Sequence, residues 1–265
     1  MAVDARLAST VMLVRDREAG IEVFMVRRSV KSEFMPDVYV FPGGSVSADD
    51  RQAEQTPGLC MAVPPEMDSD PHERTVLGSG VRAAAIRELF EEANVLLAYQ
   101  QRQLLAINEE TATRFAAYRA AFNERQGSLV AMARAEQLTL ASDHLIYFSH
   151  WITPEGMPRR YDTHFFLATA PLQQEAIYDQ LETSDGLWIH PATALDRYVQ
   201  GTFPIAFPTY HQLRNLTAHD TVSSLIAAST AKPVETHQPL LKLIDGTPHV
   251  YLPEDPGHAW SIHSP

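Results

Sequence analysis

The chain has 265 residues, 45% of them hydrophobic, and a formal net charge of −12 at pH 7. This length suits one large domain, and the acidic balance argues against non-specific nucleic-acid binding, which needs a basic surface. Cys60 is the single cysteine, so no disulfide can form within the chain. We find no apolar run long enough to span a membrane, and therefore expect no membrane partner. Because we also find no secretory leader and no terminal Ser-Lys-Leu signal, we expect the protein to be cytoplasmic.

The first half of the chain predicts a hairpin, two further strands and a helix. Apolar and β-branched runs bounded by turn residues are typical of strands, and they occur at residues 8–14, 21–27, 38–41 and 95–98. The third run leads into Gly43 and Gly44, where glycine permits a positive φ and a close approach of the backbone to a ligand. The segment 45–80 is rich in Asp, Glu, Pro and Gly, which indicates a surface loop with room for one short helix. A helix is expected at 80–93.

The second half predicts a helical insert followed by mixed elements. Asn108 is suited to cap one helix and Ser128 follows a glycine at the start of a second, and the apolar stripes of both indicate packing. Strands are then expected at 145–152, 163–168, 187–189 and 249–252, and helices at 191–195, 210–217 and 221–228. Thr209 is the expected cap of the helix at 210–217. Because strands and helices do not alternate regularly, the pattern predicts an α+β fold with one main sheet covered by helices.

One face of the helix expected at 80–93 collects three carboxylates. At about 100° per residue, Glu88, Glu91 and Glu92 fall within an arc of roughly 100°, with apolar residues on the opposite side. Like charges at this spacing repel each other, and a solvated acidic face is the ordinary interpretation of such a cluster. The glycine turn upstream favours a metal site instead, since Mg²⁺ prefers a few carboxylates together with substrate phosphates.

The turn Phe41-Pro42-Gly43-Gly44 and this helix together resemble the box of the nudix hydrolase superfamily. The family pattern is G-x5-E-x7-R-E-U-x-E-E-x-G-U, where U is a bulky aliphatic residue. The matching positions in this chain are Arg87, Glu88, Leu89, Glu91, Glu92 and Val95. Asn94 replaces the last glycine of the pattern, which is tolerable because asparagine is the usual second choice for a left-handed residue at a helix end.

The first glutamate of the pattern is the larger departure. Counting from Gly44 places it at Asp50, whereas counting back from Arg87 places it at Ser79, so an insertion of 29 residues splits the box within 45–80. The helix carboxylates are therefore expected to supply most of the metal ligation. A split box resembles the branch that contains the peroxisomal coenzyme A diphosphatase, and similar segments extend this resemblance over about residues 8–255.

The resemblance implies a nudix α/β/α sandwich with a mixed sheet and helical insertions. Residues 1–265 would form a single domain, with insertions at about 45–80 and 108–140 and a helical C-terminal extension from about 205. Glu88, Glu91 and Glu92 would hold one to three Mg²⁺ or Mn²⁺ ions against a diphosphate. In the family, the arginine at the position of Arg87 orients a box glutamate by ion pairing.

The general base is not identified by the motif, because either a box glutamate or a later loop glutamate serves in different family members. Glu182 is the candidate for the later one, since it precedes Trp188 in the Glu-x5-Trp arrangement of many nudix proteins. A solvated loop glutamate is the alternative interpretation. His150, His164 and His190 receive no role, because a lone histidine is more often structural.

Substrate contacts are expected from arginines near strand ends. Arg27-Arg28 and Arg159-Arg160 are candidates for phosphate recognition, because a guanidinium binds phosphate through parallel hydrogen bonds. Paired arginines are also common solubilising residues. Gly43 and Gly44 would bring backbone close to the substrate. Phe41, Tyr161 and Phe165 are candidates to stack on a base, although Phe165 is expected to pack inside the sheet.

The implied activity is metal-dependent hydrolysis of a nucleoside diphosphate linked to another moiety. Coenzyme A or acyl-coenzyme A is the first expected substrate, and ADP-ribose or a dinucleotide is the second. A third hypothesis is a non-catalytic nucleotide-binding module. The retained box glutamates argue against it. The expected partner is thus a nucleotide-type small molecule, and a homodimer is one option for the oligomeric state.

Overall fold

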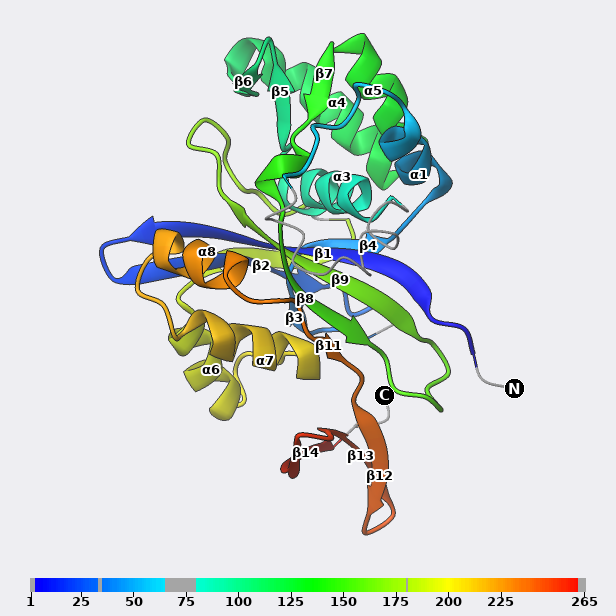
Figure 1. Ribbon diagram of the computed structural model, residues 1–265, viewed down its shortest axis with the longest axis vertical. Coiled ribbons are helices and arrows are strands. Elements are labelled where there is room, and N and C mark those ends of the chain that lie inside the picture. The colour runs from blue at the N-terminus through cyan, green and yellow to red at the C-terminus, as the bar shows by residue number, and fades with distance from the viewer. Residues whose placement is uncertain (1–2, 33–34, 65–79, 180, 262–265) are drawn as a thin grey trace.

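The computed structural model describes residues 3–32, 35–64, 80–179 and 181–261, and its centre is a mixed sheet of eight strands (Figure 1). These strands are β1 Arg6–Arg17, β2 Gly20–Arg28, β3 Tyr39–Val40, β4 Gly43–Ser45, β8 Ile146–Ile152, β9 Tyr161–Thr169, β10 Thr183–Ile189 and β11 Thr236–His237. The main path runs in the order β10-β2-β1-β9-β8-β11, while β3 pairs with β2 and β4 with β1.

Strand β1 lies at the middle of this sheet. It pairs antiparallel with β2 and β4 and parallel with β9. Alternate side chains of a strand point to opposite faces, and here Val11 and Leu13 enter one hydrophobic core while Met12 and Val14 enter the other. Because both faces are covered, this part of the strand is apolar throughout, as the apolar run at residues 8–14 indicates.

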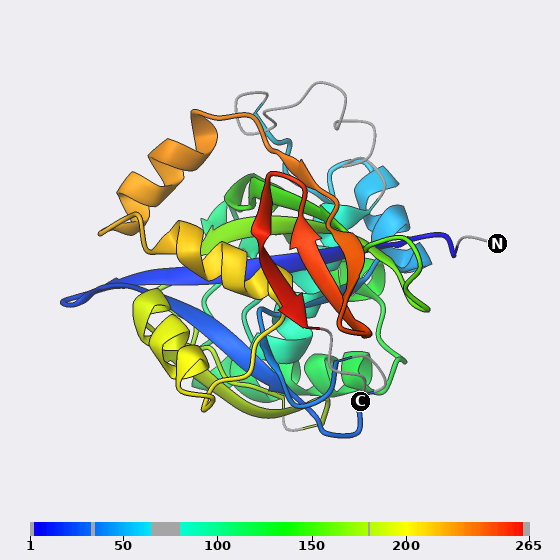
Figure 2. The ribbon, with the colours of Figure 1, turned by 90° about the horizontal axis from the view of Figure 1, so that it is seen from below.

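Helices cover both faces of the sheet (Figures 1 and 2). The face uppermost in Figure 1 carries α3 Val81–Ala93, with α1 Ala48–Gln55, α4 Glu109–Asn123 and α5 Leu129–Ala135 beyond it. The opposite face carries α6 Pro191–Val199, α7 Phe207–Leu216 and α8 Val222–Thr230. The predicted α/β/α sandwich with a mixed sheet is confirmed, and each face has its own core.

Two small sheets flank the sandwich. The upper one is formed by β5 Ala98–Gln100, β6 Gln103–Leu104 and β7 Leu138–Leu140, and a short 3-10 helix at Ser142–His144 leads from it to β8. The lower one is formed by β12 Leu240–Ile244, β13 Thr247–Leu252 and β14 Asp255–Ser261. Trp260 stacks on Tyr198 at 4.9 Å between ring centroids, which attaches this lower sheet to α6.

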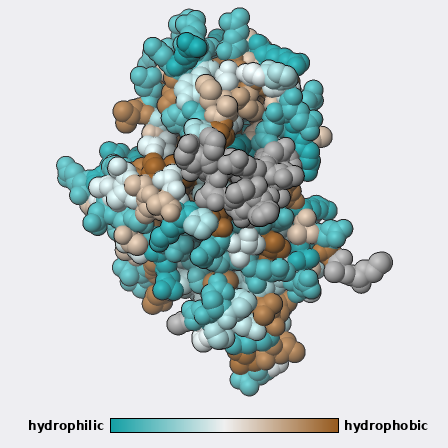
Figure 3. All heavy atoms as spheres, in the orientation of Figure 1, coloured by the Kyte–Doolittle hydropathy of each residue, from teal (hydrophilic) through white to brown (hydrophobic). Residues whose placement is uncertain are grey.

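The surface is largely hydrophilic in the orientation of Figure 3, with brown apolar atoms collected at its lower end. This end carries the exposed hydrophobic residues of β12, namely Leu240, Leu243 and Ile244. Among the helices within the described ranges, none combines the length and the apolar character needed to cross a bilayer.

Most expected elements are confirmed to within a few residues, but three predictions are wrong. The run 95–98 is not a strand, because β5 starts only at Ala98, and the Leu96 amide donates to the Gln174 side chain instead of a neighbouring strand. The helix expected at 210–217 starts at Phe207, so Thr209 lies inside it and caps nothing. The C-terminal extension is only half helical, because β11 to β14 follow α8.

The two predicted insertions contain the helices that their sequences indicate. In 45–80 the described part contains α1, whose N-cap Ser47 forms a capping box with Asp50. Residues 65–79, and Ser79 with them, lie outside the described residues. In 108–140, α4 begins directly after Asn108, which caps it as predicted. Helix α5 begins directly after Ser128, and the structure shows that Ser128 caps it.

Candidate active site

Helix α3 carries the predicted carboxylates, and its two ends are held by different devices. At the N-terminus Gly80 supplies no side-chain cap. Instead Glu54 of α1 accepts the amides of Gly80, Arg82 and Ala83 at 2.7, 2.8 and 3.0 Å. At the C-terminus Asn94 adopts the left-handed conformation, with φ 60°, and its amide donates to the carbonyl of Phe90. The predicted tolerance of asparagine at this position is confirmed.

Burial decides between the two interpretations of the acidic face. A solvated face would leave its carboxylates in water, yet Glu88 and Glu92 are only 9% and 7% exposed. The other side of the helix packs Ile86, Leu89 and Phe90 into the upper core without any exposure. Buried carboxylates need partners of opposite charge or several hydrogen bonds, so the cluster is a built site rather than a solvated surface.

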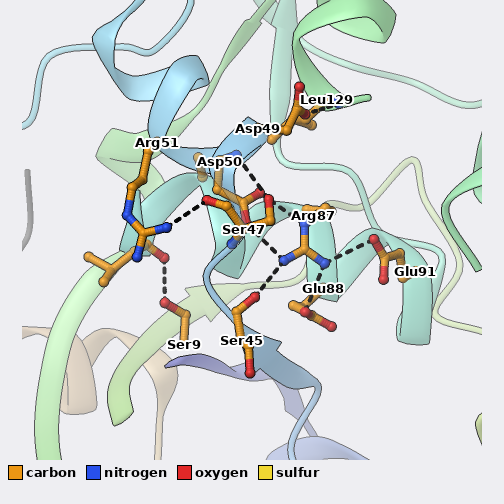
Figure 4. Close-up of polar contacts among 12 residues, drawn as sticks. Ser9, Ser45, Ser47, Asp49, Asp50, Arg51, Arg87, Glu88, Glu91 and Leu129 are labelled. Carbon is orange, nitrogen blue, oxygen red and sulfur yellow. Dashed lines mark hydrogen bonds and ion pairs between the residues drawn. The ribbon is translucent and has the colours of Figure 1, made fainter. Parts of the chain in front are cut away.

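Arg87 of α3 is one such partner, and its side chain connects α3 to β4 and to α1 (Figure 4). Its Nη1 donates to Glu88 Oε1 at 2.8 Å and to Glu91 Oε1 at 3.0 Å. Its Nη2 also donates to the carbonyl oxygen of Ser45 at 3.0 Å, just after the glycine pair in β4. Burial lowers the pKa of Arg87, but the surrounding carboxylates outweigh it and raise the pKa overall. The guanidinium therefore holds Glu88 and Glu91 in one arrangement relative to each other and to β4.

Asp50 is the residue whose part in the site sequence reasoning missed. It is fully buried, and it receives Nε and Nη2 of Arg87 at 2.9 Å each, a bidentate ion pair (Figure 4). The signal was its position six residues after Gly44, where the pattern has a glutamate. We therefore assign the insertion to the segment after Asp50. The site therefore contains a fourth carboxylate, that of Asp50, which pairs with the same arginine that holds Glu88 and Glu91.

The glycine pair brings β4 against α3. The Gly43 amide donates to Glu92 Oε2 at 3.0 Å, and a Cβ on Gly44 would lie 2.3 Å from Glu88 Oε1. The positive φ that glycine permits is not adopted, because both glycines have extended backbone within β4 and pair with Ser9 and Thr10 of β1. Glycine is needed here for space, and the group it admits is a carboxylate of α3.

Burial and mutual repulsion raise the pKa of all three helix carboxylates. Burial is the largest cause for each. The pKa of Glu91 rises to about 7 through burial and the charge of Glu88. That of Glu92 lies well above its ordinary value, although the Gly43 amide and Arg28 act in the other direction. A bound cation favours the ionised form of such carboxylates, and their all-oxygen donor set fits Mg²⁺ or Mn²⁺.

Glu182 and Arg28 approach this cluster from the edge of the sheet. The charge of Glu182 is among the causes that raise the pKa of Glu88 and of Glu92, and the charge of Arg28 lowers that of Glu92. The two segments are neighbours in the fold, because Arg28 pairs with Thr183 in the ladder of β2 and β10. Glu182 itself is exposed. The structure thus brings both predicted residues within electrostatic range of the box.

Arg27 does not act with Arg28, because successive residues of a strand face opposite sides. Its Nε lies 2.9 Å from Asp37 Oδ1, and its guanidinium lies 5.4 Å from the centre of the Tyr39 ring. Tyr39 belongs to the core on the face away from α3. Of this predicted pair, the structure therefore brings Arg28 alone to the carboxylates.

Arg159 and Arg160 lie in the loop between β8 and β9. The Arg160 side chain donates to the carbonyl oxygens of Thr153 and Val3 at 3.0 and 2.9 Å. With Arg6 and Tyr161, the pair lines a cavity of about 270 Å³. The side chain of Arg160 is thus partly occupied by the backbone of its own loop and of the N-terminal segment.

Phe41 is not a base-stacking residue in this structure. It is 3% exposed and packs into the core below the sheet, on the face away from α3. The prediction that it stacks on a substrate base is therefore wrong, because its ring has no free surface. Phe165 is likewise buried in that core, at 6% exposure.

Arg119 of α4 is a second residue that sequence reasoning missed. Its Nε donates to the carbonyl oxygen of Glu91 at 2.8 Å, and its Nη2 donates to that of Ile177 at 2.7 Å. Burial lowers the pKa of this arginine, which also lines a cavity of about 230 Å³ with Asn94 and Asp179. The contact ties the helical insert to the end of α3. No local pattern marks it, because the two helices are far apart in sequence.

Comparison with known proteins agrees with this geometry. Residues 5–216 match the family model described as the NUDT19 Nudix domain. The chain is 25% identical over 281 residues to the acyl-coenzyme A diphosphatase NUDT19 of Xenopus laevis, and the alignment covers 91% of this chain and 74% of that protein. It is 26% identical over 272 residues to the protein of the same name from Homo sapiens, with 89% and 72% covered.

Two further comparisons extend this result. A putative nudix hydrolase 7 of Caenorhabditis elegans is 29% identical over 197 residues, with 73% of this chain and 55% of that protein covered. The crystal structure of a NUDIX hydrolase from Alicyclobacillus acidocaldarius superposes with a TM-score of 0.72 at 24% identity, and covers 87% of this chain and 99% of that one. At this identity the superposition shows a shared fold.

Proposed function

The chain belongs to the Nudix hydrolase family, with a Nudix domain of the NUDT19 type, and we propose that it cleaves the diphosphate of coenzyme A or acyl-coenzyme A. As a Nudix hydrolase it acts on phosphoanhydride bonds. The observation that carries the proposed substrate is the alignment of 91% and 89% of the chain with two acyl-coenzyme A diphosphatases. The products would be 3′,5′-ADP and phosphopantetheine or its acyl form.

For the chemistry, we propose Glu88, Glu91 and Glu92 as the ligands of Mg²⁺ or Mn²⁺. Bound there, such an ion neutralises phosphate charge and lowers the pKa of a coordinated water. Arg87 keeps two of these carboxylates in register through hydrogen bonds of 2.8 and 3.0 Å. The Gly43 amide orients the third, Glu92, at 3.0 Å. These contacts thus hold the carboxylate oxygens of Glu88, Glu91 and Glu92 in place before the metal ion and the diphosphate bind.

Glu182 is our proposed general base. Two observations support this role. The Glu182 side chain is exposed on the segment beside Arg28, and its charge acts on both Glu88 and Glu92. A general base must come within hydrogen-bond reach of the attacking water, and this role for Glu182 is part of the proposal. The box glutamate Glu91 is the alternative base, in which case Glu88 and Glu92 would be the metal ligands.

For the substrate, we propose that Arg28 contacts the diphosphate, because it is the predicted arginine whose charge acts on Glu92. Arg159 and Arg160 remain candidates for the 3′-phosphate of coenzyme A, supported by the cavity that they line with Arg6. Gly43 and Gly44 contribute by admitting the box carboxylates rather than by contacting the substrate.

A substrate panel tests the proposal. Coenzyme A, acyl-coenzyme A, dephospho-coenzyme A, ADP-ribose and a dinucleotide are incubated with the protein and Mg²⁺ or Mn²⁺ in ¹⁸O-labelled water, and product masses are measured. We expect the highest kcat/KM for coenzyme A or its acyl esters. Equal turnover of coenzyme A and its dephospho form would remove 3′-phosphate recognition. A preference for ADP-ribose or the dinucleotide would select the alternative activity.

We also propose that residues 1–265 act as one Nudix domain with insertions at about 45–80 and 108–140. The support is that residues of α1, α4 and α5 share one hydrophobic core with α3. A single cooperative unfolding transition is expected in urea. The homodimer and the cytoplasmic location stay predictions, which light scattering and cell fractionation test.

A further inference from the structure

A second cluster of ligand-type side chains lies outside the box carboxylates. Within the described part of the chain, His150, Asp162 and His164 place candidate ligand atoms within 4.8 Å of one another. His150 on β8 pairs directly with His164 on β9, and Asp162 lies two residues earlier on β9. Residues two apart on a strand share a face, so all three side chains point to the α3 side of the sheet. The two imidazole rings stack with centroids 4.4 Å apart.

Each ring is oriented by a hydroxyl group at its Nδ1. His150 Nδ1 lies 2.8 Å from Thr236 Oγ1, and His164 Nδ1 lies 2.8 Å from the hydroxyl of Tyr147. Both Nε2 atoms are thereby turned toward the same oxygen, Asp162 Oδ1. His150 Nε2 hydrogen-bonds to it, and His164 Nε2 lies 3.7 Å from it. Histidine ligands of metal ions are held in this way, by a hydrogen bond at the other nitrogen.

His164 Nε2 is the second, independent sign of a ligand. The residue is 0% exposed, and this nitrogen has no hydrogen-bond partner among the described residues. Buried polar nitrogens are normally paired, and a separation of 3.7 Å from Asp162 Oδ1 is too long for a hydrogen bond. It is close to the roughly 3.4 Å between two ligands of a tetrahedral Zn²⁺ ion.

We propose that His150, Asp162 and His164 form a second metal site, which takes a divalent transition ion of the Zn²⁺ class. Two imidazoles and a carboxylate suit such an ion, whereas the all-carboxylate set on α3 suits Mg²⁺ or Mn²⁺. The Asp162 side chain is 29% exposed, so an ion can reach the site from solvent on this side. The ion replaces the proton shared by His150 and Asp162, which is released to solvent.

The position of this site indicates what the ion does. It joins β8 to β9, and through Thr236 it reaches β11, which pairs with β8. Strand β11 is only two residues long and connects α8 to the C-terminal sheet. A bound ion therefore stabilises the attachment of the C-terminal segment to the main sheet. This role is independent of the proposed function.

Metal titration of the full chain tests the site. Metal-free protein, prepared with a chelator, is titrated with Co²⁺ in excess Mg²⁺, and Zn²⁺ is then added as competitor. We expect one equivalent of Co²⁺ with the visible absorption of a site of low coordination number, displaced by Zn²⁺ and unchanged in Glu92→Gln. Absence of this absorption, or its loss in Glu92→Gln with retention in His164→Gln, overturns the proposal.

Variants separate ligands from their supports. His164→Gln and Asp162→Ala are each expected to weaken Co²⁺ binding at least 100-fold, and Thr236→Val about 10–100-fold, since it removes only a supporting hydroxyl. His249→Gln, on β13, is the matched control and should bind as wild type does. Zn²⁺ should raise the melting temperature of wild type and leave that of Asp162→Ala unchanged. If His164→Gln does not fold, Asp162→Ala replaces it as the test variant, because Asp162 is partly exposed. Wild-type affinity of Asp162→Ala for Co²⁺ would then overturn the proposed site.

Discussion

Arg87 and Asp50 form a bidentate ion pair between α3 and α1, with both nitrogen–oxygen distances at 2.9 Å and the carboxylate fully buried. Breaking a buried pair from one side leaves an uncompensated charge, which costs about 3–5 kcal/mol. Asp50→Asn should therefore lower the free energy of unfolding by about that amount. It should also lower kcat, because Arg87 orients Glu88 and Glu91. Urea unfolding and steady-state kinetics measure both.

Asp50→Glu is the matched control for this pair, because it keeps the charge and has the residue type of the family pattern. It should retain more activity and stability than Asp50→Asn. Equal behaviour of the two variants would show that the ion pair has no part in positioning the box.

Glu92→Gln should reduce turnover by orders of magnitude while the fold is preserved. The variant removes a proposed metal ligand, but burial already holds the pKa of Glu92 well above its ordinary value. A neutral side chain therefore costs the metal-free protein little stability. Turnover with Mn²⁺ and the melting temperature in chelator are the two measurements. Glu110→Gln, an exposed change on α4, is the control, and wild-type turnover in Glu92→Gln would refute the metal site.

The stability of the metal-free protein should depend on pH through Glu91. Its pKa is about 7 in the folded protein and about 4.3 in an unfolded chain. The folded state thus binds more protons between these values, and stability is lost as pH rises from about 4.5 through about 7. Melting temperatures in chelator between pH 4.5 and 8 measure this, and Glu91→Gln should flatten the slope. Added Mg²⁺ should restore stability at the upper end, and an identical slope in Glu91→Gln would contradict the assignment.

Glu54 should be required for the position of α3, although it lies outside the box. Its carboxylate accepts three amides at the helix N-terminus, at distances from 2.7 to 3.0 Å. Loss of a helix cap costs about 0.5–2 kcal/mol, and a negative charge also favours this end of the helix. Glu54→Ala should lose roughly this stability in urea unfolding, while Gln52→Ala, exposed on the same helix, should lose little. Equal losses would show that Glu54 is not a cap in solution.

Glu182→Gln distinguishes a general base from a solvated loop residue. Removal of a general base lowers kcat by about 10²–10⁴-fold, without changing the metal concentration needed for half-maximal activity. The measurement is kcat as a function of pH and of Mg²⁺ concentration. Glu175→Gln, another exposed loop glutamate, should have wild-type kcat. A change of less than twofold in Glu182→Gln would move the role to Glu91.

Local properties of the chain were predictable because they depend on residues a few positions apart. Glu88, Glu91 and Glu92 share a face of any helix that contains them. Asn94 and Asn108 act on amides or carbonyls within about one turn, and both cap as predicted. Spacing alone was sufficient in these cases, because helix geometry is the same in every fold.

What the sequence did not show concerns the face or partner of a side chain. Phe41 enters the lower core, and Arg27 pairs with Asp37 instead of facing the carboxylates beside Arg28. Gly43 and Gly44 lie in a strand that passes close to Glu88 and do not adopt the positive φ that glycine permits. Each outcome depends on how the sheet and α3 pack, which no window of the sequence contains.

The sequence by itself determined the α+β class and the three carboxylates of α3, because a helical motif and its hydrophobic pattern are local. The same motif gave the family resemblance, and that resemblance implied the sandwich. Only the tertiary structure decided that these carboxylates are buried and that Asp50 and Glu54 of α1 hold their helix. It also decided that His150 and His164, which carry no motif, meet at Asp162. The physical reason is that burial and charge pairing arise between segments tens of residues apart, and exist only once the sheet brings those segments together.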